Sequence, residues 1–191
     1  MSKQSIEDEL FTGEMLGGKA LAPGEYTGCK FLNCDFSNAD FSSIHFLDCE
    51  FQNCNLSLAK LNKTMFSEVQ FNQCKMLGLH FEQCNPFGFA LYCTGCMMDH
   101  SCFYRLKMKK ASFKDSKLQE VDFTECDLTS ATFENCNLED ATFDQTILEK
   151  ADFRTSFNYT IDPERNRLKK AKFSLSGSRG LLVKYDILIS E

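Results

Sequence analysis

The chain has 191 residues, of which 43% are hydrophobic and 25% are charged, and its formal net charge is −6. This length suits one domain with a sizeable interior. No run approaches the roughly 18 apolar residues of a membrane-spanning helix. The start, MSKQSIEDELFTG, lacks the basic and apolar regions of a secretory signal. We therefore expect a cytoplasmic protein with no membrane partner, in which the 11 cysteines stay reduced.

The first 22 residues carry no recognisable repeat and are partly acidic. Chain ends of this kind are often poorly ordered unless they are tied to the neighbouring structure. We expect residues 1–22 to be an N-terminal extension or a cap over the first layer of the following domain.

A large apolar residue recurs every five positions in the range 23–175. One series runs from Tyr26 to Phe81, a second runs from Met98 to Phe153, and Phe173 keeps the second register. Two residues before most of these positions stands Cys or Ala, and most of the cysteines occupy this place. Because a buried thiol behaves as a small hydrophobic group, we interpret these cysteines as interior packing.

A period of five fits neither an α-helix nor a plain strand. In a helix each step would displace the apolar stripe by roughly 140°, and in a strand successive steps would reach opposite faces. The chain must therefore turn every five residues. The large and small residues then point inward, and the remaining polar positions face solvent and form the corners.

These residues resemble the pentapeptide-repeat family, whose pattern is a small residue, a polar one, Leu or Phe, and two variable ones. The segments CDFSN, ADFSS, VDFTE, CDLTS, CNLED and ADFRT carry the resemblance, which covers most of residues 26–175. It implies an all-β fold, a right-handed quadrilateral β-helix with a C-terminal cap, in which four repeats make one coil. Phe31, Phe51 and Phe71 would then stack in a ladder.

The register breaks near residues 85–97, because Phe81 and Met98 are 17 residues apart, two more than three repeats. The intervening NPFGFALYCTGC contains proline and glycine, which favour turns. We predict a bulge or a short protruding loop in which Pro86, Phe87 and Phe89 are candidate contacts with a partner. The alternative is a packing defect without a function.

Residues 176–191 are rich in large apolar side chains. Solenoids need capped ends, so we expect this segment to cover the last coil and to be a candidate dimerisation segment. The segment IDPERNR, followed by GLL, also resembles the end of the pentapeptide-repeat proteins of quinolone resistance and microcin immunity. That resemblance implies a homodimer joined through the C-terminal end. The candidate residues are Leu181, Leu182, Tyr185, Ile187 and Ile189.

Residues Cys93, Cys96, His100 and Cys102 have a spacing superficially like that of a small zinc site. Cys96 already has an interior place in the repeat, however, and His100 is expected to point outward. We therefore predict no metal. The sequence offers no catalytic triad, carboxylate pair or dinucleotide fingerprint that stands out. We expect no catalytic residue, no cofactor and no enzymatic activity.

Acidic residues dominate the segment between Lys117 and Lys150, which contains no basic residue. Regularly spaced carboxylates on a rod can present a negative surface to a protein that binds nucleic acid phosphates. The alternative is that they only keep the walls solvated. A negative solenoid is not expected to bind nucleic acid directly. The candidate partner-binding residues are Glu120, Asp122, Glu125, Asp127, Glu134, Glu139, Asp140 and Asp144.

The family resemblance implies a function for such a rod. It would bind DNA gyrase or topoisomerase IV as a DNA mimic and protect the enzyme from quinolones or a peptide toxin. The alternative is a cytoplasmic interaction scaffold whose protein partner is not a topoisomerase.

Overall fold

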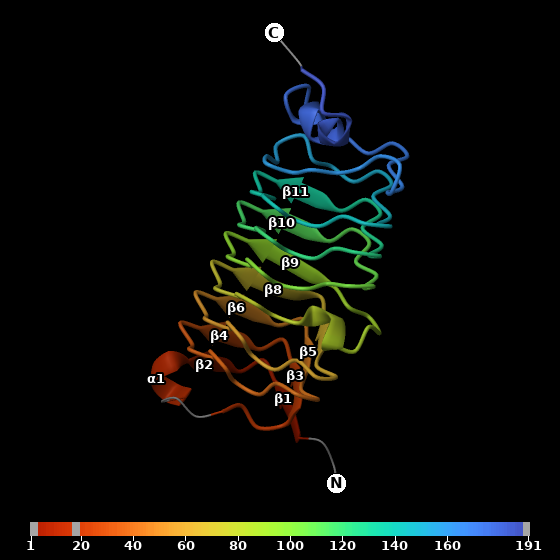
Figure 1. Ribbon diagram of the computed structural model, residues 1–191. Helices are drawn as coiled ribbons and strands as arrows, with labels where there is room; N and C mark the ends of the chain where they lie inside the picture. Colours follow the sequence, from red (N-terminus) through yellow and green to blue (C-terminus); the bar gives the residue numbers. More distant parts are fainter. Residues whose placement is uncertain (1–3, 17–19, 189–191) are drawn as a thin grey trace.

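The protein, described by a computed structural model over residues 4–16 and 20–188, is a rod whose first and last described residues lie at opposite ends (Figure 1). Nearly all regular structure is parallel β-sheet. A four-stranded sheet has the order β1-β3-β5-β7, and a seven-stranded sheet has the order β11-β10-β9-β8-β6-β4-β2.

The strands are short, as expected when each occupies one side of a coil. The first sheet contains β1 (Gln4–Glu7), β3 (Gly24–Thr27), β5 (His45–Leu47) and β7 (Met65–Ser67). The second contains β2 (Leu10–Thr12), β4 (Lys30–Leu32), β6 (Glu50–Gln52), β8 (Val69–Asn72), β9 (Leu91–Thr94), β10 (Ser112–Lys114) and β11 (Thr132–Glu134).

Each strand pairs with the strand one coil further on, and the usual register is 20 residues. Phe31 lies opposite Phe51 on one side, and Lys117 lies opposite Asn137 on another. Four repeats therefore make one coil, which confirms the right-handed quadrilateral β-helix. We name the sides A to D in chain order, after the repeats centred on Tyr26, Phe31, Phe36 and Phe41; side A contains the first sheet and side B the second.

Stacked phenylalanines fill the interior. The rings of Phe31 and Phe51 lie 4.5 Å apart with an interplanar angle of 13°, and those of Phe133 and Phe153 lie 4.7 Å apart at 9°. Burying one such ring contributes roughly 1.5–3 kcal/mol. The ladder of side B continues from Phe11 to Phe173, and Cys93 is the one small residue in it.

The small residue of each repeat lies inside, two positions before the central one. Several of these small residues donate a hydrogen bond to the preceding coil: the Cys49 thiol donates to the carbonyl oxygen of Tyr26 at 3.2 Å, and the Thr64 hydroxyl donates to that of Phe41 at 2.7 Å. All cysteines are free thiols, and all except Cys102 are buried. The interpretation of the cysteines as interior packing is confirmed.

The corners are formed by the last residue of each repeat, which adopts the left-handed conformation. Ser43 has a φ of 62° and Asp140 a φ of 56°. An Asp or Asn before the central residue supports the corner, because its side chain accepts the backbone N–H two positions on. Asp40 accepts that of Ser42 at 2.9 Å, and this is the polar place of the sequence pattern.

The register break lies on side A. Phe71 pairs with Cys93, 22 residues later, because two residues are inserted in the segment 85–90 after the short 3-10 helix η1 (Phe81–Gln83). The insertion projects as a turn in which the Phe87 side chain is 79% exposed. Strand pairing on side A stops after β7 and continues beyond the insertion as single bridges, such as Lys107 with Asp127.

Both ends of the rod differ from the central coils. In the range 1–22, where we expected an extension or cap, β1 and β2 already pair with β3 and β4, and the short helix α1 (Gly13–Leu16) follows. The coil therefore begins before residue 23. At the other end, η2 (Gly177–Leu181) and η3 (Val183–Tyr185) lie over the last coil, where the Ile161 N–H donates to the Gly180 carbonyl oxygen at 3.0 Å.

Candidate interaction surface

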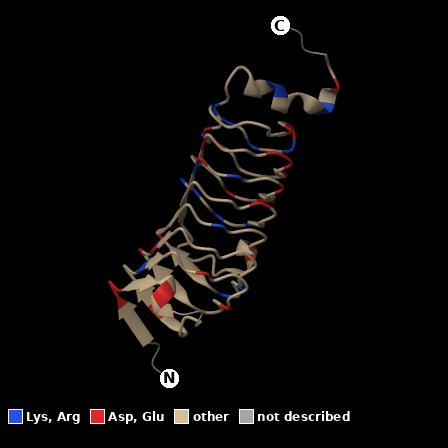
Figure 2. Cartoon of the chain, turned by 90° about the vertical axis from the view of Figure 1, so that its left-hand side faces the viewer, with Lys and Arg blue, Asp and Glu red and all other residues tan. Residues whose placement is uncertain are grey.

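Carboxylates gather along the edge between sides C and D. Backbone bonds stack its corners: the His100 N–H donates to the Gln119 carbonyl and the Glu120 N–H to the Glu139 carbonyl, both at 2.9 Å. Figure 2 shows acidic segments along the right-hand edge of the upper coils. We call Asp99, Glu120, Glu139 and Asp140 the acidic edge.

The structure brings most of the predicted acidic residues together but separates two of them. Glu120, Asp122, Glu125, Glu139, Asp140 and Asp144 lie on side D or on its two edges. Asp127 lies on side A, where it pairs with Lys107 and Ile147. Glu134 lies at the end of β11 on side B. Five residues carry the chain to the next side, so neighbours in sequence do not share a surface.

Several of the predicted carboxylates are paired with cations. Asp144 lies 2.5 Å from Arg165, Glu125 lies 2.7 Å from Arg105, and Glu134 lies 3.0 Å from Lys114. The hydrogen bond from Arg105 lowers the pKa of Glu125. A partner would therefore meet these three carboxylates already paired with a cation.

The carboxylates of the acidic edge, in contrast, are not paired with Lys or Arg among the described residues. Within the described part of the chain, Asp140 has no partner, and Glu120 contacts only His100, at 3.2 Å. Asp99 accepts the Gln119 N–H at 3.2 Å and Glu139 accepts the Gln119 side-chain amide at 2.5 Å. The sequence reasoning missed Asp99, although it precedes Gln119 and Glu139 by steps of 20 residues.

Asp122 and Asp127 serve the fold. The Asp122 carboxylate accepts the Thr124 N–H at 2.8 Å, and that of Asp127 accepts the Thr129 N–H at 3.1 Å. Lys109 lies 3.3 Å from Asp127. Burial would raise the pKa of Asp127, but the bonds from Thr129 and Lys109 outweigh it and lower the pKa.

The projecting loop presents fewer contacts than predicted. Pro86 and Phe87 are exposed, but Phe89 is buried, with its ring centroid 6.1 Å from that of Phe81 and 6.5 Å from that of Phe66. The prediction of Phe89 as a surface contact is therefore wrong. Side chains alternate in direction along the loop, so that Phe87 points outward and Phe89 points into the core, against Phe66 and Phe81.

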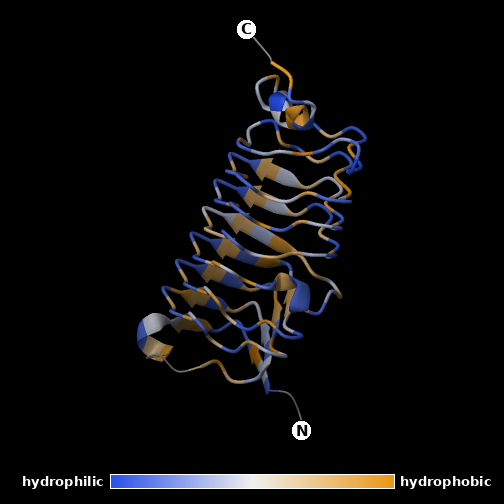
Figure 3. Cartoon of the chain, viewed as in Figure 1, coloured by the Kyte–Doolittle hydropathy of each residue, from blue (hydrophilic) through white to orange (hydrophobic). Residues whose placement is uncertain are grey.

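The C-terminal segment divides into a packed part and an exposed part. Leu181 packs against the core and Leu182 is half-buried, whereas Tyr185 and Ile187 are exposed. The Tyr185 hydroxyl donates to Glu164 at 3.0 Å. Ile189 lies outside the described residues. Leu175, Val183 and Leu188 are also exposed, and of these three only Leu175 lies before the apolar stretch 181–189 of the sequence. Figure 3 shows the last described segment in the hydrophobic colour.

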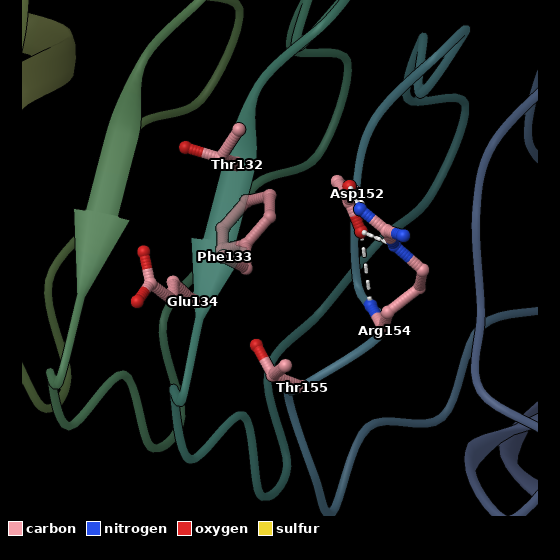
Figure 4. Close-up of a pocket in the computed structure, with 6 residues that line it drawn as sticks. All are labelled: Thr132, Phe133, Glu134, Asp152, Arg154 and Thr155. Atoms are coloured by element: carbon pink, nitrogen blue, oxygen red, sulfur yellow. Dashed lines mark hydrogen bonds and ion pairs between the residues drawn. The ribbon is translucent and has the colours of Figure 1, made fainter.

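The hollows on the rod are shallow. One of about 420 Å³ lies on side B and is lined by Thr132, Phe133, Glu134, Asp152, Arg154 and Thr155 (Figure 4). Its charged groups are paired, because Arg154 lies 2.7 Å from Asp152. The Arg154 hydrogen bond holds the pKa of Asp152 at about 2, although partial burial opposes this shift. A nucleophile with an adjacent base is not among the residues that line it.

The zinc-like string does not converge. Cys93 occupies a central place on side B, Cys96 an interior place on side C, and His100 lies at the corner beside Glu120. Across residues 4–16 and 20–188, no group of three or more His, Cys, Asp or Glu side chains is arranged to hold a metal ion. The same ranges contain no helix long and apolar enough to cross a membrane.

Stacked coils around one continuous hydrophobic core define a solenoid repeat protein. The family model described as "Pentapeptide repeat region" matches residues 25–87 and 93–159. The chain belongs to the pentapeptide-repeat family. The gap between the two matched ranges coincides with the end of the projecting loop and the start of β9.

Solved structures share this architecture. A trypsin-treated variant of QnrB1, a plasmid-mediated fluoroquinolone resistance protein, matches with a TM-score of 0.64 and 20% identity over 99% of this chain and 91% of that chain. Full-length QnrB1 matches with a TM-score of 0.56 and 16% identity over 96% of this chain and 100% of that chain. At these identities the likeness shows the fold. Curated protein sequences contain no match to this chain.

Proposed function

We propose that this protein binds a type II topoisomerase, DNA gyrase or topoisomerase IV, through its acidic edge, which takes the place of DNA phosphates. The observation that carries the proposal is the stack of carboxylates at Asp99, Glu120, Glu139 and Asp140, which have no Lys or Arg partner among the described residues. Successive levels lie about 4.8 Å apart. The edge therefore presents a dense row of negative charge, as a nucleic acid backbone does.

The fold supports this choice of partner. The chain resembles the pentapeptide-repeat proteins of quinolone resistance, and the solved structures that match it include one named for fluoroquinolone resistance. By occupying the DNA-binding surface, the rod would protect the topoisomerase from quinolones or a peptide toxin in the cytoplasm. It acts as a binding protein and not as an enzyme, and Pro86 and Phe87, which are exposed on side A, provide a second contact away from the acidic edge.

The proposed functional unit is a homodimer joined at the C-terminal end. Leu175, Val183, Tyr185, Ile187 and Leu188 are exposed there, which leaves large apolar side chains in water on the last layer of the rod. A second copy that covers them removes this surface from water, and this gain is the usual driving force of protein association.

A gyrase supercoiling assay, with and without a quinolone, tests the proposed function. The variant Glu120→Gln/Glu139→Gln/Asp140→Asn removes charge from the acidic edge, and its half-maximal concentration for protection should rise about ten-fold or more. The matched control Glu50→Gln/Asp115→Asn/Glu134→Gln removes three carboxylates from side B and its edge. It should stay within about two-fold of the wild type.

Absence of both inhibition and protection at micromolar protein would contradict the topoisomerase proposal and favour the scaffold with another protein partner. Equal loss of activity in the two variants would contradict the role of the acidic edge, because the effect would then follow net charge alone.

A further inference from the structure

Side A changes the sign of its charge at the projecting loop. The corner residues between sides A and B stack in one column, with Asp8, Gly28, Asp48 and Glu68 before the loop and Lys110, Ser130, Lys150 and Lys170 after it. The column therefore has the same number of levels on each side of the loop, which lies at its centre.

The neighbouring outward positions follow the same division. Before the loop, the carboxylates on side A and on its corner with side B are Glu7, Asp8, Glu25, Asp48 and Glu68, and no Lys or Arg among the described residues lies between them. We call these residues the acidic half of side A. After the loop, the cations are Lys107, Lys109, Lys110, Lys150, Arg167, Lys169 and Lys170, with only Asp127 and Glu149 interspersed. We call these cations the basic half.

Much of this charge is unpaired within the molecule. Lys109 and Arg167 pair with Asp127 and Glu149. Glu25 lies 3.7 Å from His45, and Glu68 accepts the Tyr92 hydroxyl at 2.7 Å. In the described chain, Asp8, Asp48, Lys110, Lys150 and Lys170 have no ion-pair partner and are exposed. The remaining charges are available to a partner.

We propose that side A is a self-complementary interface, on which a second copy of this chain lies antiparallel. A two-fold axis through the loop places the first level of one rod against the last level of the other. Asp8 then faces Lys170 and Glu68 faces Lys110, whereas Asp48 and Lys150 meet the uncharged corners Ser130 and Gly28. Such an isologous contact uses the same surface on both copies. A parallel arrangement would set like charges against each other.

Phe87 lies at the position that this symmetry requires for a central contact. Its side chain is 79% exposed on side A, and the axis brings the two copies of it together. A polyanion such as duplex DNA would match only the basic half and would be repelled by the acidic half. A second copy accounts for both halves and for the exposed ring between them.

The pairing through side A leaves the acidic edge free, because the acidic edge between sides C and D lies diagonally opposite the charged corner between sides A and B. It covers Phe87, so it would compete with any partner that contacts the loop. The inference does not depend on the proposed topoisomerase function, and it can be tested with the purified protein alone.

Crosslinking of Phe87→Cys by a short bis-maleimide is the direct test. The native cysteines are buried except Cys102, which is partly exposed, so the wild type serves as the background. We expect a crosslinked dimer with Phe87→Cys and only background with Leu58→Cys, whose exposed residue lies between sides C and D. In a dimer joined at the C-terminal ends, the two loops would lie roughly 40 Å apart, beyond the reach of the reagent.

Charge exchange tests the register. Added to Phe87→Cys, Lys169→Glu/Lys170→Glu should reduce the crosslinked yield about ten-fold, and further addition of Glu7→Lys/Asp8→Lys should restore it. The matched control Lys75→Glu/Lys117→Glu on side C makes the same change in net charge and should leave the yield within about two-fold. Salt at 0.5 M should weaken the pairing.

Three results would overturn the proposal. Phe87→Cys would give only the background yield of crosslinked dimer, the charge-exchanged variant would not recover its yield, or the control Lys75→Glu/Lys117→Glu would lose as much yield as Lys169→Glu/Lys170→Glu. Binding of a DNA duplex to the basic half with an affinity unaffected by Glu7→Lys/Asp8→Lys would also overturn it, in favour of a polyanion.

Discussion

The corner residue Ser43 stands in the left-handed region with a φ of 62°, as do the corner residues of nearly every repeat. An L-residue loses roughly 1–2 kcal/mol in this conformation, whereas glycine does not. Its neighbour Ser42 has an ordinary φ, and its N–H donates to the Asp40 carboxylate at 2.9 Å. The two serines therefore offer a matched pair of positions.

We predict that Ser43→Gly stabilises the protein by about 0.5–1 kcal/mol, because relief of strain exceeds the extra chain entropy of glycine. Ser42→Gly should destabilise it by about 0.5–1 kcal/mol, because glycine adds chain entropy to the unfolded state and relieves no strain at this position. Urea unfolding followed by circular dichroism measures both. Equal destabilisation by the two changes would contradict strain at the corner.

At the scale of elements, the projecting loop contains an exposed phenylalanine, Phe87, and a buried one, Phe89, only two positions apart. Phe87→Ala should change the free energy of unfolding by less than about 0.5 kcal/mol, because this side chain is exposed. Phe89→Ala should cost about 3–5 kcal/mol, because its ring fills space between Phe66 and Phe81. Thermal unfolding provides the comparison. If Phe87→Ala proved the more damaging of the two, the assignment of the rings would be wrong.

The coil was predictable because its rule is local: an inward residue every five positions. The first coil was missed although Ile6, Phe11, Leu16 and Leu21 keep this spacing back from Tyr26. The small residue is absent there, since Gln4 and Glu9 stand two places before Ile6 and Phe11. Pairing of β1 and β2 with the next coil requires only backbone groups, so strands form without the full sequence pattern.

The candidate site was predictable only in part, because a surface on a coil combines residues 20 apart. The sequence segment 117–150 joined Asp127 and Glu134 to the acidic set, although they lie on sides A and B. It left out Asp99, which lies two levels before Glu139. The partners that neutralise Asp144 and Glu125 lie about one coil away, at Arg165 and Arg105.

At the scale of the whole molecule, net charge is a poor guide to the surface. Behind the formal charge of −6 lie surfaces of opposite sign, which include an acidic edge, an acidic half of side A and a basic half of side A. Because surfaces of opposite charge occur on one rod, two copies can attract each other although each has a negative net charge. Contacts through these surfaces should weaken as salt screens the charges, with a Debye length of about 10 Å at 0.1 M.

The C-terminal end should behave differently, because its exposed groups are apolar. We predict that Ile187→Asp/Leu188→Asp raises the dissociation constant of the end-to-end dimer roughly 100-fold. Both side chains are exposed, so the thermal unfolding of the coil should not change. Sedimentation velocity in 0.5 M salt, where side-by-side pairing is screened, measures the effect, with Leu58→Asp as the control for an exposed leucine elsewhere. Salt does not weaken contacts made by apolar burial, so an end-to-end dimer should persist in 0.5 M salt. If the double variant dimerised as strongly as the wild type, the dimer contact would not lie at the C-terminal end.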